Sequence, residues 1–319
     1  MLSDNKIRVV SIAGPTASGK TSLSVNLAIC FGAEIVSSDS MQIYRGMDIA
    51  TAKPTKEEMN GIPHHLMDFV DTTEAYSVAR YIEDASKAIS DIHNRHKLPI
   101  IVGGTGLYMD SLLSGITYCD GEVDLKLRKE LQDKFEIVGI DKMLEELASF
   151  DPDSASRLSV ERNPKRIIRA MEVFYTTGVT MTEQNLRSKS KESLYNPTKI
   201  ALNFRDRQKL YDRINLRVDI MLKDGLLKEA EEYFSSNYGN TAVQAIGYKE
   251  LKPYFDGVLS LDECIETLKR STRRYAKRQL TWFMRDPEIK WFYVDDYNDS
   301  HSLINEVSDY LIQEGFELE

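Results

Sequence analysis

The residues with the clearest chemical potential form a loop motif near the start of the chain, which matches G-x-x-x-x-G-K-[ST]. Its glycines let the backbone curl so that several N–H groups point into one concavity, where an anion can sit. The positive end of a following helix and the charge of Lys20 favour phosphate oxygens, and Thr21 can reach a bound metal ion. We therefore predict a phosphate-binding loop made of Gly14, Pro15, Thr16, Ala17, Ser18, Gly19, Lys20 and Thr21.

The motif leaves open which phosphate compound binds. Proteins that hydrolyse ATP through such a loop have a second apolar strand that ends in an acid, and this acid holds magnesium. The comparable segment here, Leu98–Val102, is followed instead by the glycine-rich segment 103–106, and the guanine-binding motif N-K-x-D does not occur. We expect a diphosphate or a nucleoside triphosphate in the loop, with Mg²⁺ bridging its oxygens beside Thr21.

Alternating strand and helix patterns are expected to position this loop. Apolar runs at 7–13, 33–37 and 98–102 predict strands, and helical spacing of apolar residues predicts helices at about 20–31 and 77–96. Such alternation is typical of a parallel sheet with helices on both faces. Ligands of these sheets bind beyond the carboxyl ends of the strands. The phosphate-binding loop, the loop around Asp39 and the loop at 103–108 should therefore share one edge.

The pattern changes near residue 118, where charged, amphipathic helical sequence begins. The next strand pattern starts only at Ile200, and helices are predicted at about 207–235 and 261–284. We expect an α/β core formed by residues 1–117 and 199–319, which carries a helical insertion domain at 118–198.

The composition excludes several classes of protein. No run of about 18 apolar residues occurs, and the first residues lack the features of a signal peptide, so we expect a cytoplasmic protein. The three cysteines, Cys30, Cys119 and Cys264, are too far apart to form a Cys-pair metal site. His64 and His65 are adjacent in an extended segment and would point to opposite sides, so a shared metal ion is not expected.

The charge is unevenly distributed along the chain. The net charge is −9, but residues 286–319 hold ten of the 50 acids and only one of the 41 bases, so the remainder is neutral overall. Residues 269–285 contain seven bases and no acid. At 100° per residue, six of these bases fall within one half of a helix: Lys269, Arg270, Arg273, Arg274, Lys277 and Arg278. This face predicts contact with an RNA backbone, and an ordinary solvated helix face is the alternative.

Seven segments together resemble the bacterial tRNA dimethylallyltransferases. They are GPTASGKT, SSDSMQIYRGMDIATAKPT, PHHLMD, GGTGLY, DRINLRVDIML, AIGYKE and AKRQLTWF, and they span about residues 9–285 in the family's order. The resemblance implies a P-loop kinase-like α/β core with helices on both faces of a parallel sheet, and a helical, tRNA-binding insertion domain. It also implies dimethylallyl diphosphate, Mg²⁺ and the anticodon stem-loop of tRNA as partners. A monomer is expected, because one chain can hold one tRNA.

The implied reaction transfers the dimethylallyl group to the exocyclic amine of the adenosine 3′ of the anticodon (position 37), in tRNAs that read codons beginning with U. Asp39 is the candidate general base, and a helix cap or a magnesium ligand is its alternative role. Thr105 is expected near the leaving group or the adenosine, unless it only shapes a turn. Arg217, with Arg213 one helical turn away, is expected to bind the diphosphate, unless both form ion pairs within their helix.

The resemblance also implies a set of tRNA contacts, in the Asp39 and Thr105 loops, the insertion domain, the AIGYKE segment and the basic helix. Within the basic helix, Gln279 and Trp282 are candidates for base contacts. Tyr44, Tyr108 and Phe283 are expected in the core instead. The full set of expected contacts is Asp39, Ser40, Met41, Gln42, Thr105, Arg128, Lys165, Arg166, Arg169, Gln244, Ala245, Ile246, Gly247, Tyr248, Lys249, Arg274, Lys277, Arg278 and Gln279.

Two other functions use some of the same features. A small-molecule kinase would bind ATP in the same loop and would turn it over, but it leaves the basic helix and the insertion unexplained. A non-catalytic tRNA-binding protein would use the loop only as a seat for an anion. The expected grouping of Lys20, Asp39 and Thr105 at one sheet edge favours an enzyme.

Overall fold

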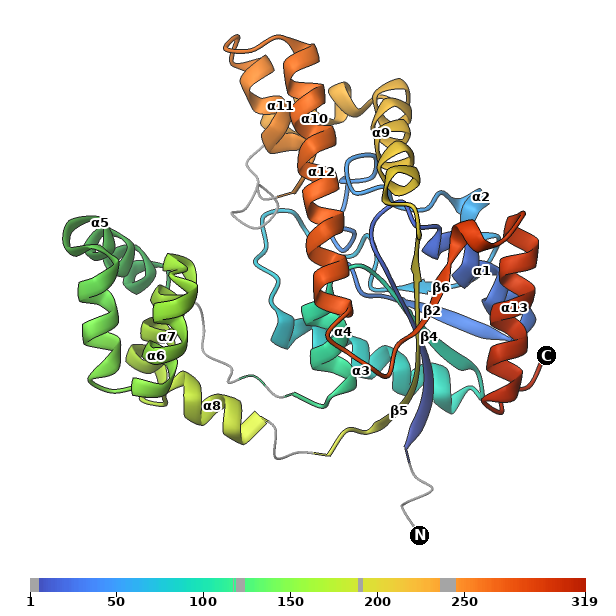
Figure 1. Ribbon diagram of the computed structural model, residues 1–319, viewed down its shortest axis with the longest axis horizontal. Helices are drawn as coiled ribbons and strands as arrows, with labels where there is room; N and C mark the ends of the chain where they lie inside the picture. Colours follow the sequence, from blue (N-terminus) through green and yellow to red (C-terminus); the bar gives the residue numbers. More distant parts are fainter. Residues whose placement is uncertain (1–5, 117, 119–123, 189–191, 236–244) are drawn as a thin grey trace. The chain divides into compact units, whose positions relative to one another are not determined.

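The computed structural model describes residues 6–116, 118, 124–188, 192–235 and 245–319 (Figure 1). The chain divides into two compact units, of which unit 1 comprises Met1–Leu113 and Leu194–Glu319, and unit 2 comprises Ser114–Ser193. None of the described helices is long and apolar enough to cross a membrane.

Unit 1 is built on a six-stranded sheet whose strand pairs are all parallel. The spatial order is β3-β2-β4-β1-β5-β6, with β1 (Ile7–Ala13), β2 (Ala33–Ser37), β3 (His64–His65), β4 (Leu98–Val102), β5 (Tyr195–Asn203) and β6 (Lys290–Tyr293). The predicted parallel α/β fold is confirmed. Strand β5 begins five residues before the predicted Ile200, because its polar first half is held by pairing with β1 and not by an apolar pattern.

Helices precede and follow the strands of unit 1. They are α1 (Lys20–Cys30), α2 (Lys56–Met59), α3 (Val78–Asn94), α4 (Gly106–Leu113), α9 (Arg207–Lys223), α10 (Leu226–Ser235), α11 (Tyr248–Phe255), α12 (Leu261–Phe283) and α13 (Ser300–Gln313), with a 3-10 turn η2 (Val294–Asp296). The single helix predicted at 207–235 is in fact two helices. The chain turns between them at Gly225, whose φ of 106° is open to glycine and strained for other residues.

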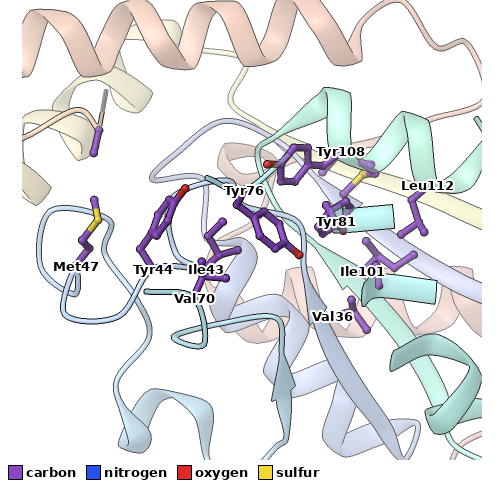
Figure 2. Packing of buried hydrophobic residues seen from close by; sticks show 14 of the residues in the cluster. Val36, Ile43, Tyr44, Met47, Val70, Tyr76, Tyr81, Ile101, Tyr108 and Leu112 are labelled. Atoms are coloured by element: carbon purple, nitrogen blue, oxygen red, sulfur yellow. The ribbon is translucent and has the colours of Figure 1, made fainter. Parts of the chain in front are cut away.

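The sheet has a hydrophobic core on each face, because successive side chains of its strands point to opposite sides. Val10 and Ile12 of β1 pack in the cluster that contains α1 and α13, and Val9 and Ala13 pack in the cluster that contains α3 and α4. Figure 2 shows the second cluster, in which Tyr76, Tyr81 and Tyr108 gather close to Val36 and Ile101 of the sheet. The predicted core positions of Tyr44, Tyr108 and Phe283 are confirmed, since each is at most 7% exposed.

The acidic C-terminal segment covers one face of the sheet. Helix α13 buries Leu303, Val307 and Leu311 in the same cluster as α1. Arg8 of β1 donates hydrogen bonds to the carbonyls of Glu314 and Gly315, and each is 2.7 Å long. Helix α13 of this segment is therefore amphipathic, with Glu306 and Asp309 exposed and its apolar face in the core of unit 1.

Unit 2 is helical, with α5 (Leu125–Ala148), α6 (Pro152–Glu161), α7 (Pro164–Thr177) and α8 (Met181–Ser188) around its own small core. Asn163 caps α7 by accepting a hydrogen bond from the amide of Lys165, and Gly178 ends that helix with a φ of 69°. Helix α5 is interrupted at Gly139, whose φ is 77°.

Candidate functional site

Three loops meet at the carboxyl ends of the adjacent strands β2, β4 and β1. The glycine at 103 is required by this packing, because a Cβ there would lie 2.0 Å from the carbonyl oxygen of Ser38. The amide of Gly103 donates to the carbonyl of Ile12, and the amide of Thr105 donates to that of Ser38, both over 3.2 Å. The loop after β4 therefore ties the loop after β2 to β1.

The loop at 14–21 has the geometry of an anion site. It leaves β1 through Gly14, enters α1 after Gly19, and uses positive φ values of 140° and 96° at these glycines and 63° at Ala17. The ammonium of Lys20 folds over it and donates to the carbonyls of Gly14 (3.0 Å) and Pro15 (2.7 Å). The hydroxyl of Ser18 is buried without a hydrogen-bond partner among the described residues.

Two arginines of α9 reach the same loop. Arg213 donates from Nε to the carbonyl of Ala17 over 3.0 Å. Arg217 donates to the hydroxyl of Thr16 over 3.5 Å and to the carbonyl of Ala52 over 3.3 Å. Neither arginine forms an ion pair with another described residue, so the alternative of ion pairs within α9 is wrong.

The cations of this loop are held without a full set of counter-charges. Burial, and next the charge of Arg217, lower the pKa of Lys20 to about 7, while Asp39 opposes the shift. Burial also lowers the pKa of Arg217, against the attraction of Asp39 and Glu58. A bound polyanion would supply the missing negative charge, so the electrostatics suit a diphosphate.

Asp39 lies two residues after the end of β2, where it begins a turn. Its Oδ1 accepts hydrogen bonds from the amides of Met41 (2.8 Å) and Gln42 (3.3 Å). Its Oδ2 accepts none from the described part of the chain. No helix follows directly, so Asp39 is not a helix cap, and one carboxylate oxygen remains available for a proton.

Thr105 connects its loop to the Asp39 loop. Its Oγ1 accepts a hydrogen bond from the amide of Ser40 over 3.1 Å and can donate to the Ser40 hydroxyl over 3.4 Å. Thr105 and Asp39 therefore lie on joined loops.

The segment that follows the Asp39 loop is fixed by a single carboxylate. Glu229 of α10 accepts hydrogen bonds from the consecutive amides of Asp48, Ile49 and Ala50, at 2.7–3.0 Å. Two residues later, the carbonyl of Ala52 accepts from Arg217 and from the side-chain amide of Gln42. Glu229 therefore helps to hold the carbonyl that orients Arg217. Nothing in the sequence indicated this, because Glu229 lies in an ordinary amphipathic helix.

The AIGYKE segment corrects part of the expected tRNA surface. Ala245 and Tyr248 are each 1% exposed. The Tyr248 hydroxyl donates to Glu229 over 2.7 Å, and its ring stacks on Tyr233 at 4.1 Å. These two side chains belong to the core and are not accessible to RNA, while Lys249 is exposed and Ile246 half-buried. Gln244 lies outside the described residues.

The basic helix α12 is divided between an inner and an outer face. Lys269 pairs with Asp219 over 2.7 Å and Arg273 donates to Asn215 over 2.6 Å, so these two point toward α9. The basic face is therefore narrower than its helical projection predicted. Four exposed residues on it form no ion pair with the described chain, and they are Arg270, Arg274, Lys277 and Arg278.

The polar groups of Gln279 and Trp282, which were expected to contact bases, are bonded within unit 1. Gln279 is 5% exposed, and its side-chain amide is bonded to the backbone at Thr16 and Gly104. The indole N–H of Trp282 donates to Asp110 over 2.6 Å. Gln279 is buried and Trp282 is half-buried, and a sequence motif alone cannot distinguish such contacts within unit 1 from contacts with RNA.

The cations expected to contact tRNA in unit 2 differ in their surroundings. Arg128 and Arg169 both pair with Glu172, a carboxylate that is only 2% exposed, so they neutralise a buried charge. Arg166 pairs with Glu161. Lys165 is exposed and makes no ion pair with a described residue.

Comparison with known proteins gives consistent matches over nearly the whole chain. The family model described as IPP transferase matches residues 42–286. The tRNA dimethylallyltransferase of Thermoanaerobacter sp. (strain X514) is 46% identical over 96% of this chain and 98% of its own length. That of Bacillus subtilis (strain 168) is 47% identical over 91% of this chain and 92% of its own length.

Solved structures agree with these sequence matches. The full-length tRNA isopentenylpyrophosphate transferase of Bacillus halodurans aligns with a TM-score of 0.72 and 42% identity, over 97% of this chain and 96% of that one. A eukaryotic dimethylallyltransferase acting on tRNA aligns with a TM-score of 0.77 and 33% identity, over 96% of this chain and 80% of that one.

Proposed function

This chain belongs to the IPP transferase family, and we propose that it transfers the dimethylallyl group from dimethylallyl diphosphate to the exocyclic amine of adenosine 37 in tRNA. One structural observation supports this most strongly. The cationic phosphate-binding loop, the carboxylate of Asp39 and the Thr105 hydroxyl lie on three hydrogen-bonded loops at one sheet edge. We further propose that the chain acts as a monomer in the cytoplasm, on tRNAs that read codons beginning with U.

The phosphate-binding loop is proposed to hold the diphosphate of the donor. Its backbone amides and the charges of Lys20, Arg213 and Arg217 would stabilise the negative charge that develops on the leaving group. Mg²⁺ would be held by the Thr21 hydroxyl and phosphate oxygens, since that hydroxyl makes no hydrogen bond with the described chain. When bound, the ion would supply further charge neutralisation.

Asp39 is proposed as the general base of the transfer. The N6 lone pair of the adenosine attacks the allylic C1 as the C1–O bond to the diphosphate breaks, and the bonding electrons leave with the diphosphate. The proton of N6 passes to the carboxylate of Asp39, whose Oδ2 is available. Thr105 holds the adjoining Ser40 amide, and so fixes the loop from which Asp39 projects.

The test of this function is transfer of label. Purified protein is incubated with unmodified tRNA, Mg²⁺ and labelled dimethylallyl diphosphate, without ATP, and the label retained on adenosine 37 is counted. Retained label is the expected result. Absence of label, together with consumption of ATP when a nucleotide is offered instead, would favour the small-molecule kinase.

The outer face of α12 is proposed to bind the RNA backbone. Changing Arg274, Lys277 and Arg278 together to glutamine should weaken tRNA binding at every salt concentration. Because the variant can no longer neutralise three phosphates, the slope of log K against log salt should become shallower by about two to three. Filter binding or fluorescence anisotropy between about 50 and 300 mM salt measures both effects.

A matched control removes the same charge from another part of unit 1. Glutamine is placed at three exposed lysines that lie on other elements, namely Lys87, Lys209 and Lys290. This variant should keep most of the wild-type slope. Equal slopes for the two triple variants would contradict a specific role for α12.

A further inference from the structure

The side chain of Gln279 joins two of the three loops at the site. Its Oε1 accepts a hydrogen bond from the amide of Thr16 over 2.9 Å, and its Nε2 donates to the carbonyl of Gly104 over 3.0 Å. Thr16 belongs to the loop that is proposed to hold the diphosphate, and Gly104 directly precedes Thr105. One buried amide therefore spans the part of the site that binds the donor and the part that supports Asp39.

The surroundings of Gln279 leave it little freedom. It is 5% exposed, and a Cβ at Gly104 would lie 2.0 Å from its Nε2, so a side chain at residue 104 would displace the amide from this position. Tyr275 lies one helical turn earlier, with its hydroxyl beside Thr105 and Gln279. Trp282 packs against Gly106, the first residue of α4, where a Cβ would lie 2.2 Å from the indole.

We infer that Gln279 is a positioning residue for the transfer reaction. It fixes the distance between the phosphate-binding loop and the loops that carry Thr105 and Asp39, and it contacts neither substrate. The inference rests on the proposed function. In a displacement reaction the attacking nitrogen, the allylic carbon and the leaving oxygen must lie in line, and a misplacement of about 1 Å can cost on the order of a hundredfold in rate. The phosphate-binding loop can hold the diphosphate without Gln279. The reacting atoms meet only when this loop and the Asp39 loop are correctly placed relative to each other.

The decisive variant is Gln279→Met, which keeps the length of the side chain and removes both hydrogen bonds. Its kcat is expected to fall by about 10- to 100-fold, because the reacting atoms are less well aligned. The KM for dimethylallyl diphosphate and the KM for tRNA should each change by less than about threefold, because the contacts that bind each substrate in its ground state are kept. Kinetics at 25 °C with the labelled donor measure all three quantities.

A loss of stability alone must be separated from this effect. Phe283 is 1% exposed on the same helix, one turn beyond Gln279, and no hydrogen bond joins its side chain to the site. Phe283→Leu removes buried contacts and should lower Tm, as Gln279→Met also should, but it should keep kcat near the wild-type value at 25 °C.

A second variant, Gln279→Glu, keeps an acceptor for the Thr16 amide. It can donate to the Gly104 carbonyl only when its carboxyl is protonated. Its kcat relative to wild type should therefore rise as pH falls from about 8 to 6, the range in which a buried carboxyl can titrate. The titratable and charged groups around this position are Tyr275 and Arg278 on α12, Asp39 after β2, and Lys20 and Arg217, which bond to Pro15 and Thr16. The ratio for Gln279→Met should not depend on pH.

The outcomes separate two failures. If wild type transfers no label, the proposed function is wrong. If wild type is active, the inference is overturned by a Gln279→Met kcat within threefold of wild type, by an equal kcat loss in Phe283→Leu, or by a loss confined to the KM of one substrate. A kcat loss with intact KM values, absent in Phe283→Leu and partly restored in Gln279→Glu at low pH, supports it.

Discussion

Replacing Asp39 by asparagine is expected to lower kcat by roughly 10²- to 10⁴-fold, the usual range for the loss of a general base. Asparagine keeps the Oδ1 acceptor that receives the amides of Met41 and Gln42, so the turn should persist. It cannot take a proton from the adenosine amine, because its second oxygen is replaced by a donor. The measurement is single-turnover transfer with saturating tRNA and labelled donor.

The binding of tRNA should be almost unchanged in Asp39→Asn, within about twofold, because the lost interaction acts in the transition state. Asp71 offers a matched control, since its Oδ1 also holds a turn, by accepting a hydrogen bond from the amide of Thr73 over 2.9 Å. Asp71→Asn should retain wild-type kcat. If Asp39→Asn also retained it, Asp39 would be only a turn residue and the proton would need another acceptor.

The sequence predicted most of the framework of unit 1. The bounds of β1, β2 and β4 agree with the apolar runs at 7–13, 33–37 and 98–102, because buried parallel strands need apolar residues on both faces. Their carboxyl ends then had to share an edge, which placed Lys20, Asp39 and Thr105 on neighbouring loops. These features follow from periodicity and chain direction alone.

Periodicity and chain direction could not predict which bases of α12 pair with α9 and which remain exposed. A helical projection shows which residues share a face, but it does not show that α9 covers part of that face and pairs Asp219 with Lys269. The same limit applies to Gln279, which a motif could assign equally to RNA or to the backbone of two loops. It also applies to Glu229, whose three amide partners lie about 180 residues away in the sequence. Such contacts depend on tertiary packing between distant segments.

Lys20 is the residue whose charge should respond most directly to the ligand. Its pKa of about 7 in the folded chain is well below the ordinary value of 10.5, first because of burial and second because of Arg217. At pH 8 the side chain is then mostly neutral, and a bound diphosphate should favour its ammonium form. Binding of inorganic diphosphate at pH 8 should therefore take up on the order of one proton more in wild type than in Lys20→Met. Calorimetry in buffers of different ionisation enthalpy measures this difference.

Lys20→Met is also expected to lower kcat/KM for dimethylallyl diphosphate by about 10²- to 10³-fold, which is the usual effect of losing one preorganised hydrogen-bond donor to a developing anion.

The stability of the fold should not fall in Lys20→Met. Between about pH 7 and 10.5 the unfolded chain binds the lysine proton more tightly than the folded chain, so wild-type stability rises with pH across this window. Below pH 7 the folded chain carries the full cost of a buried ammonium, and Lys20→Met should have the higher Tm without ligand. That advantage should shrink from pH 7 to pH 10, and a Tm difference independent of pH would show that Lys20 is charged throughout.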